Sequence, residues 1–195
     1  STAATVARVA RLSQLGVEGL LVVTPAYVRP TQEGLYRHFE AVAAASRVPL
    51  ILYNVPSRTA VDLLPATVAR LAKLPRIVAI KEAVDSMERV RELVRLVPPG
   101  FTVLSGDDAT AREAVAHGAR VIRLDAFVYI WKNAGTRCLD LPEGQALIRV
   151  FQRLLAQAGG EASAILPSIT NVGQDRNVLY FGDGGARQAD LVPFA

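Results

Sequence analysis

The chain has 195 residues, of which 51% are hydrophobic and 21% are charged. This length suits one domain, or a domain with an appendage, and the apolar fraction excludes a wholly disordered chain. A complete (β/α)8 barrel usually needs roughly 250 residues, so the length argues against one.

The charge balance gives little support to nucleic-acid or membrane binding. Lys and Arg number 22 against 18 Asp and Glu, which gives a formal net charge of +4. The arginines alternate with glutamates, as in residues 88–92, and form no basic block. No apolar run reaches the roughly 18 residues that span a bilayer, and the single cysteine, Cys138, cannot form an internal disulfide. We therefore expect a cytoplasmic protein that binds neither nucleic acid nor membranes.

Short β-branched apolar runs alternate with segments of helical period along the first two thirds of the chain. A helix is predicted over residues 3–15, and further helices over residues 31–46, from residue 65 onward, over 86–97 and over 141–158. The predicted strands are residues 19–24, 50–55, 77–82, 102–107 and 121–125. Strands that alternate with helices in this way form βαβ units and a parallel sheet.

The regular alternation of short apolar runs and helical segments ends after residue 126. We therefore divide the chain into an α/β domain over residues 1–126 and a second part over residues 127–195, with one helix and an irregular, glycine-rich tail. No chemistry is assigned to the tail.

Lys81 is the most informative single residue. It follows Ile77-Val78-Ala79-Ile80, at the end of a predicted buried strand. An ammonium group is costly to bury, so apolar surroundings favour the neutral amine, the nucleophile that forms a Schiff base with a ketone. The alternatives are a side chain that extends into solvent or one that pairs with Glu82.

Tyr53 has the same place on the preceding predicted strand, one strand–helix unit earlier. Since the carboxyl ends of parallel strands meet at one rim, Tyr53 and Lys81 are expected to lie close together. A tyrosine hydroxyl there can donate and accept protons, although a tyrosine in the core is the alternative. Arg58, on the loop that follows Tyr53, is either a group that grips a substrate carboxylate or a solvated arginine.

Two further residues lie at the predicted rim. Gly106, in Ser105-Gly106-Asp107-Asp108, is expected to allow close approach to the site, while this run caps a helix that starts near Ala109. Tyr27 lies on the loop after the first strand, as a rim residue or an interface residue. The sequence holds no dinucleotide-binding glycine motif after a strand, no P-loop, no nucleophile elbow and no Cys/His cluster with metal-ligand spacing.

Four segments together resemble the 4-hydroxy-tetrahydrodipicolinate synthase (dihydrodipicolinate synthase) family over about residues 1–122: VTPAYVRPTQEGLYRHF, ILYNVPSRTAVDLLPATVARLA, IVAIKEA and VLSGDDATA. The resemblance implies a (β/α)8 barrel, usually a homotetramer, that acts as a class I aldolase in lysine biosynthesis. Pyruvate forms a Schiff base on a lysine, without a cofactor, and the enamine then attacks L-aspartate 4-semialdehyde. The five predicted strands would be the fourth to the eighth of that barrel, so the implied fold is a partial TIM barrel.

The same resemblance implies a role for each candidate residue. Lys81 in IKEA matches the Schiff-base lysine, and Tyr53 in YNVPSRT matches the tyrosine that shuttles protons. Tyr27 matches a tyrosine that family members lend across a dimer interface, and Arg58 matches the arginine that receives the carboxylate of the semialdehyde. Ile122 falls where the family's backbone contacts pyruvate.

Some features of the family are missing from the sequence. The Gly-Thr-Thr-Gly-Glu segment that supplies the carboxylate contacts of pyruvate is not found, and Arg123 and Asp125 add charges to the last predicted strand. Ala60 stands where the family usually has a glycine. Two alternatives therefore stay open: a sister enzyme, such as N-acetylneuraminate lyase or a 2-keto-3-deoxy sugar acid aldolase, and a truncated fragment of the family without catalytic activity.

Overall fold

The computed structural model describes residues 1–106, 110, 113, 121–125, 130–136, 141–157, 164–168, 179–181 and 185–187. It divides into two compact units, Ser1–Ala111 and Arg112–Ala195. The predicted boundary at residue 126 stays a prediction. Within the described residues, no helix is both long enough and apolar enough to cross a bilayer.

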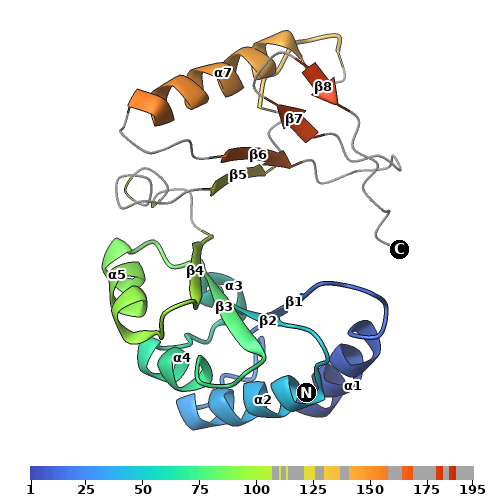
Figure 1. Cartoon of the computed structure of the whole chain (residues 1–195), viewed down its shortest axis with the longest axis vertical. Coiled ribbons are helices and arrows are strands. Elements are labelled where there is room, and N and C mark those ends of the chain that lie inside the picture. Colours follow the sequence, from blue (N-terminus) through green and yellow to red (C-terminus); the bar gives the residue numbers. More distant parts are fainter. Residues whose placement is uncertain are drawn as a thin grey trace. The chain divides into compact units, whose positions relative to one another are not determined.

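The first unit is an alternation of helices and strands (Figure 1). Its helices are α1 (Thr2–Leu12), α2 (Gln32–Ala45), α3 (Pro56–Thr59), α4 (Pro65–Leu71) and α5 (Met87–Leu96). Its strands are β1 (Leu20–Val23), β2 (Leu50–Asn54), β3 (Ile77–Glu82) and β4 (Thr102–Ser105). The sequence predicted all of these except α3, which at one turn is too short to show a helical period.

The four strands form one parallel sheet in the order β1-β2-β3-β4. Tyr53 on β2 pairs with Val23 on β1 and with Lys81 on β3. Lys81 in turn pairs with Leu104 on β4. Because successive residues of a strand point to opposite faces, this register places Val23, Tyr53, Lys81 and Leu104 in one row across one face of the sheet.

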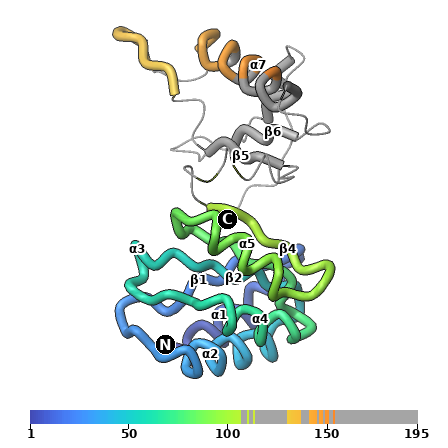
Figure 2. The backbone as a smooth tube through the Cα atoms, turned by 90° about the vertical axis from the view of Figure 1, so that its left-hand side faces the viewer, coloured from blue at the N-terminus to red at the C-terminus, as the bar shows by residue number. Residues whose placement is uncertain are grey.

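Among the described residues of the first unit, the long helices cover one face of this sheet. Figures 1 and 2 show α1, α2, α4 and α5 on the same side of the strands, with neighbouring helices packed against one another. The core lies between the helices and the sheet, and its fully buried side chains include Leu35, Phe39, Val42, Leu50, Leu52, Leu63, Val68, Leu71, Ile80 and Leu93. The strands supply alternate residues to this core, so the intervening residues face the other side.

The other face of the sheet carries apolar side chains that stay exposed. Leu21 is 52% exposed, Val23 is 44% exposed and Leu104 is 42% exposed. In a closed barrel of parallel strands this face forms the packed interior. The sheet thus has helices on the face that is the outside of such a barrel and apolar side chains on the face that is its interior. This arrangement matches a partial (β/α)8 barrel, as predicted.

The helix starts follow from residues that are suited to those positions. The side chains of Ser1, Thr31 and Ser86 each accept a hydrogen bond from a backbone N–H in the first turn of α1, α2 and α5. Pro65 occupies the first turn of α4, where a missing N–H leaves no hydrogen bond unmade.

The second unit contains β5 (Val121–Asp125), α7 (Pro142–Gln157), β6 (Ala164–Ser168), β7 (Leu179–Phe181) and β8 (Gly185–Arg187). β5 pairs in parallel with β6, and β7 pairs with β8 in an antiparallel ribbon. The β1–β4 sheet has four strands, and the fifth predicted strand, β5, pairs with β6. β7 and β8 lie in the part that the sequence describes as an irregular tail. A short apolar run predicts a strand but does not specify its partner, and runs of three residues give too little alternation to be recognised.

Candidate functional site

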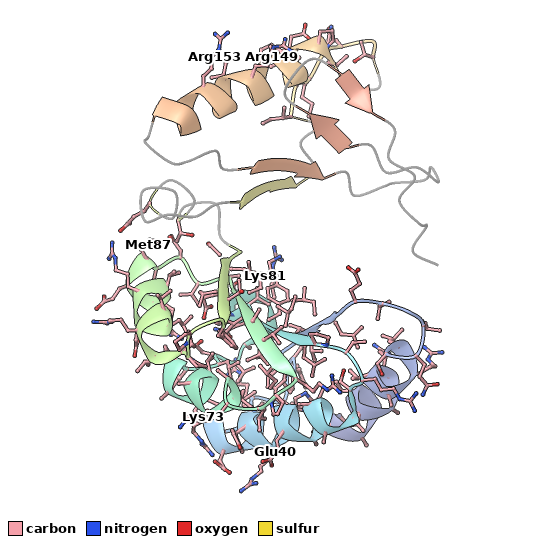
Figure 3. All side chains as sticks on the ribbon, viewed as in Figure 1. Glu40, Lys73, Lys81, Met87, Arg149 and Arg153 are labelled. Carbon is pink, nitrogen blue, oxygen red and sulfur yellow. The ribbon has the colours of Figure 1, made fainter. Side chains whose placement is uncertain are left out.

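Lys81 and Tyr53 lie side by side at the carboxyl ends of β3 and β2. They are register partners, and the Lys81 Nζ atom lies 4.8 Å from the centre of the Tyr53 ring. Figure 3 shows Lys81 on the side of the sheet away from the helices. Both side chains are half-buried, so the amine and the ring are reachable from solvent. The contact has the geometry of a cation–π interaction.

Gly106 borders the Lys81 side chain directly after β4. A Cβ atom at this position would lie 2.8 Å from Lys81 Cε and 3.2 Å from Lys81 Cγ. The same atom would lie 3.2 Å from the Cβ of Ala83. The space that a side chain would take at residue 106 is therefore filled by the lysine, which matches the predicted close approach of this glycine to the site.

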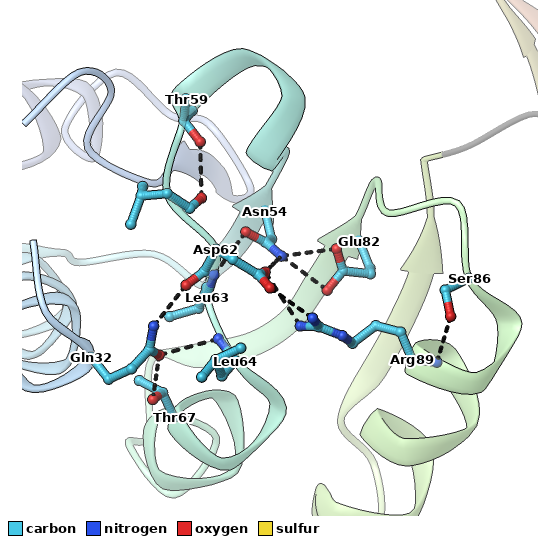
Figure 4. Close-up of polar contacts among 11 residues, drawn as sticks. Gln32, Asn54, Thr59, Asp62, Leu63, Leu64, Thr67, Glu82, Ser86 and Arg89 are labelled. Atoms are coloured by element: carbon cyan, nitrogen blue, oxygen red, sulfur yellow. Dashed lines mark hydrogen bonds and ion pairs between the residues drawn. The ribbon is translucent and has the colours of Figure 1, made fainter. Parts of the chain in front are cut away.

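The residues that follow Tyr53 and Lys81 form a buried polar cluster on the opposite, helix-covered face. Asn54 and Glu82 are register partners and are both fully buried. The Asn54 Nδ2 group donates to both carboxylate oxygens of Glu82, at 2.9 and 3.2 Å (Figure 4). Glu82 therefore bonds to Asn54 rather than to Lys81, because neighbouring residues on a strand point to opposite faces. The alternative of a Lys81–Glu82 pair was wrong.

Two more residues complete this cluster, which we call the Asn54–Glu82 cluster (Asn54, Asp62, Glu82 and Arg89). Asn54 Nδ2 also donates to Asp62 Oδ1 at 2.8 Å, and Asp62 accepts two hydrogen bonds from the Arg89 guanidinium, at 2.7 and 3.3 Å. The Oδ1 atom of Asn54 accepts from the backbone N–H of Leu63 at 3.0 Å. The cluster joins the ends of β2 and β3 to the segment before α4 and to the first turn of α5 (Figure 4).

Burial raises the pKa of Glu82 to about 7. The hydrogen bond from Asn54 and the positive charge of Arg89 act in the opposite direction, whereas the negative charge of Asp62 adds to the increase. The same Asp62 carboxylate raises the pKa of Arg89, against the effect of burial. Glu82 is thus a buried carboxyl group that titrates near neutral pH, directly behind the Lys81–Tyr53 pair.

The loops after β1 and β2 are tied together beside the site. The Tyr27 N–H donates to the Thr59 carbonyl oxygen at 3.1 Å, and the buried Thr24 hydroxyl donates to Thr59 Oγ1 at 3.1 Å. The Tyr27 side chain is 92% exposed, and Arg58 is exposed at the end of α3. Ala60, which ends α3, has a left-handed conformation with φ 59° and ψ 20°.

The remaining candidates cannot be related to this pair of side chains. Ile122 lies on β5 in the second unit, and its side chain is outside the described part of the chain. Asp107, Asp108 and Ala109, which the sequence assigned to a helix cap, are also outside the described residues. The candidate site therefore consists of Lys81, Tyr53 and Gly106, with Tyr27 on the loop after β1 and Arg58 on α3 of the same unit.

A groove of about 340 Å³ runs along the open edge of the sheet, and its lining reaches Val23, the register partner of Tyr53. It is bounded by α1 and β1, and its lining includes Ser1, Ala4, Thr5, Arg8, Val9, Leu12 and residues 20–23. It contains none of the candidate residues. The Lys81–Tyr53 pair lies on the open face of the sheet.

From the sequence, no role in the site was predicted for Asn54, Asp62 or Arg89, and Glu82 was named only as an alternative partner of Lys81. A signal for Asn54 and Glu82 was present, because each is a polar residue directly after an apolar strand and directly after a candidate site residue. A period of two then places Asn54 and Glu82 together behind the pair. Asp62 and Arg89 lie on separate loop and helix segments, and only the folded chain brings them to the cluster.

Comparison with known proteins agrees with this fold. Residues 1–125 match the Dihydrodipicolinate synthetase family. A 4-hydroxy-tetrahydrodipicolinate synthase from Methylococcus capsulatus is 55% identical over 120 residues, which cover 61% of this chain and 41% of the relative. The enzyme of the same name from Escherichia coli is 50% identical over 158 residues, covering 80% of this chain and 54% of the relative.

Solved structures give the same result. The dihydrodipicolinate synthase from Aquifex aeolicus matches with a TM-score of 0.58 and 42% identity, over 60% of this chain and 41% of that one. The enzyme from Acinetobacter baumannii, solved in complex with pyruvate, matches with a TM-score of 0.58 and 46% identity, over 60% of this chain and 40% of that one. The chain spans about half the length of the curated relatives it matches. It belongs to the dihydrodipicolinate synthetase family.

Proposed function

We propose that the chain acts as a pyruvate-dependent class I aldolase of the 4-hydroxy-tetrahydrodipicolinate synthase type, in lysine biosynthesis. The observation that carries this proposal is the Lys81–Tyr53 pair, with Nζ 4.8 Å from the ring centre on the open face of a parallel sheet. The ends of parallel barrel strands are where such enzymes hold their catalytic groups. An amine beside a phenol provides both the nucleophile and a proton carrier for carbonyl addition.

The first half of the proposed reaction takes place on Lys81. The neutral amine attacks the ketone carbon of pyruvate, a C–N bond forms, and the carbonyl oxygen takes up a proton. Loss of that oxygen as water leaves a protonated Schiff base. Tyr53 would donate and accept the protons of these two steps, since its hydroxyl belongs to the ring that the amine contacts.

In the second half, a proton leaves the methyl group of the Schiff base and an enamine forms. Its carbon attacks the aldehyde of L-aspartate 4-semialdehyde, which forms the new C–C bond. Arg58 would bind the carboxylate of this substrate, since it is exposed on α3, the helical turn that follows β2. The covalent intermediate is held by the protein's own lysine, so the proposed reaction needs no cofactor.

Tyr27 and the assembly belong to the same proposal. The Tyr27 side chain is 92% exposed, so it is free to contact a second copy of the chain. We infer a cytoplasmic homo-oligomer in which this tyrosine completes a proton relay. Analytical ultracentrifugation of the chain and of its Tyr27→Ala variant would test this: a monomeric wild-type chain would contradict the relay.

Reductive trapping tests the chemistry. The folded chain is incubated with pyruvate and borohydride, digested and analysed by mass spectrometry, with Lys81→Arg as the matched control. The proposal predicts one reduced pyruvate on the Lys81 peptide and none in the control. An unmodified Lys81 in folded protein would contradict the proposal and favour a non-catalytic fragment. If Lys81 is trapped, a fresh sample without borohydride would then be offered pyruvate with either aspartate semialdehyde or N-acetylmannosamine, which separates the synthase from the sister lyase.

A further inference from the structure

We propose that Asn54 and Glu82 are positioning residues, which clamp the ends of β2 and β3 so that the Tyr53 ring lies against the Lys81 amine. This role rests on the proposed function, because it concerns the geometry of the same pair. It assigns a purpose to a buried polar cluster that touches neither the amine nor the phenol.

Each residue of the clamp is the direct neighbour in the chain of one residue of the Lys81–Tyr53 pair. Asn54 follows Tyr53, and Glu82 follows Lys81. The two pairs are in register, so any slip or separation that breaks the Asn54–Glu82 contact also moves Tyr53 relative to Lys81. The clamp adds a side-chain bond of 2.9 Å to the backbone bond from Ala83 N to the Asn54 carbonyl, also 2.9 Å.

A buried carboxyl group is an expensive way to stabilise a core. Glu82 has no exposed surface, and a well-packed apolar residue there would avoid the cost of removing a carboxylate from water. Buried polar networks restrict the arrangement of the elements they join more than they raise stability. Here the elements joined are the two strands that carry Tyr53 and Lys81, together with the segment of Asp62 and the helix of Arg89.

The clamp depends on the protonation of Glu82. In the ionised form both oxygens accept from the Asn54 amide, whereas a protonated carboxyl turns one of those acceptors into a donor. Among the described residues, the charged groups that face Glu82 are Asp62 from the segment before α4 and Arg89 from α5; its partner on β4 is Ser105. Burial raises the pKa of Glu82 to about 7. As the pH rises through neutrality, Glu82 becomes ionised and both of its oxygens accept from Asn54, which strengthens the clamp.

A magnetic resonance experiment on the pyruvate-free chain tests the clamp directly. The sequence has three lysines, Lys73, Lys81 and Lys132, so ¹³C-lysine labelling with Lys81→Arg as a reference assigns the Lys81 methylene signal. The Tyr53 ring shifts this signal, because the end of the Lys81 side chain lies against it. In the wild type, the signal should move with a midpoint near pH 7. In Glu82→Gln that transition should disappear, whereas the exposed Glu18→Gln control should keep it.

A second variant covers the case in which Glu82→Gln does not fold. Arg89→Met removes a positive charge that lowers the Glu82 pKa, so the midpoint of the Lys81 signal should move to higher pH. Arg89 bonds to Asp62 and not to Lys81, so a direct effect on the lysine is excluded. A Lys81 signal with the same midpoint in wild type, Glu82→Gln and Arg89→Met would overturn the clamp.

Trapping then relates the clamp to chemistry. At saturating pyruvate, the rate of adduct formation should fall at least about tenfold in Glu82→Gln relative to Glu18→Gln. The pyruvate concentration that gives half the maximal rate should stay unchanged, because misalignment by a fraction of an ångström slows the reaction more than it weakens binding. Equal rates in the two variants would overturn the positioning role. If the wild-type chain forms no adduct, the proposed function fails instead, and the Lys81 signal still decides whether Glu82 controls the pair.

Discussion

Gly106→Ala places a single methyl group against the side chain on which the proposed chemistry depends. The new Cβ would lie 2.8 Å from Lys81 Cε, whereas carbon atoms in contact are separated by at least about 3.5 Å. The lysine must therefore move by about 0.7 Å or more. Gly106 is not among the residues with a positive φ, so alanine fits the backbone and the effect arises from the methyl group alone.

The expected effect falls on reactivity rather than on stability. The far end of a lysine side chain can yield, so the free energy of unfolding should drop by less than about 1 kcal/mol. A displacement of this size from the Tyr53 ring should slow adduct formation by roughly 10- to 100-fold. The assay is the initial rate of pyruvate trapping on Lys81, with unfolding in urea as the check on stability.

Gly144→Ala is the matched control for this variant. Its new Cβ would come no closer than 4.0 Å to Ile130, and alanine is the better helix former on α7. Its trapping rate should equal that of the wild type. A Gly106→Ala variant that also traps pyruvate at the wild-type rate would refute the argument that this glycine makes room for the lysine.

Three further variants test the energetics of the same region, each by urea unfolding. Ala60→Gly should raise the free energy of unfolding by about 0.5–1 kcal/mol, because Ala60 has φ 59°, whereas Ala7→Gly within α1 should lower it by about 1 kcal/mol; the same sign for both would contradict this. For Glu82 the folded-state pKa of about 7 exceeds the reference value of 4.5, so its contribution to stability is present at low pH and is lost as the pH rises through this window. The stability of the wild type relative to Glu82→Gln should therefore fall by about 3 kcal/mol between these pH values, and a constant difference would refute the buried titration. Arg89→Met breaks a largely buried ion pair and should cost about 2–3 kcal/mol, against less than about 1 kcal/mol for Arg37→Met, whose ion pairs are exposed; equal losses would count against the cluster.

The α/β alternation of the first unit could be predicted because its elements carry strong local signals. Apolar runs such as Leu50–Asn54 and Ile77–Glu82 form strands that supply part of their residues to the core. Thr31 and Ser86 cap the helices that they were expected to start. The spacing of those runs also predicted that Tyr53 and Lys81 lie close together at the ends of neighbouring strands, and the two residues are register partners.

Other features depend on contacts that no local pattern encodes. The partner of β5 is β6, a strand more than forty positions further along the chain, at about residues 164–168. Ala60 has a left-handed conformation although its sequence position carries no glycine. The Asn54–Glu82 cluster was missed although both residues lie inside predicted strands, because the range of a strand does not show which side chains meet its buried polar residues. The Asp62–Arg89 ion pair joins separate elements and has no local signal.

Formation of a Schiff base on Lys81 is the central claim, and one measurement tests it most directly. The folded 195-residue chain is treated with pyruvate and borohydride, and the peptides that contain Lys73, Lys81 and Lys132 are compared by mass spectrometry. We expect a reduced pyruvate on Lys81 alone, and no adduct in the Lys81→Arg variant. No adduct on Lys81, or equal modification of all three lysines, would contradict this claim.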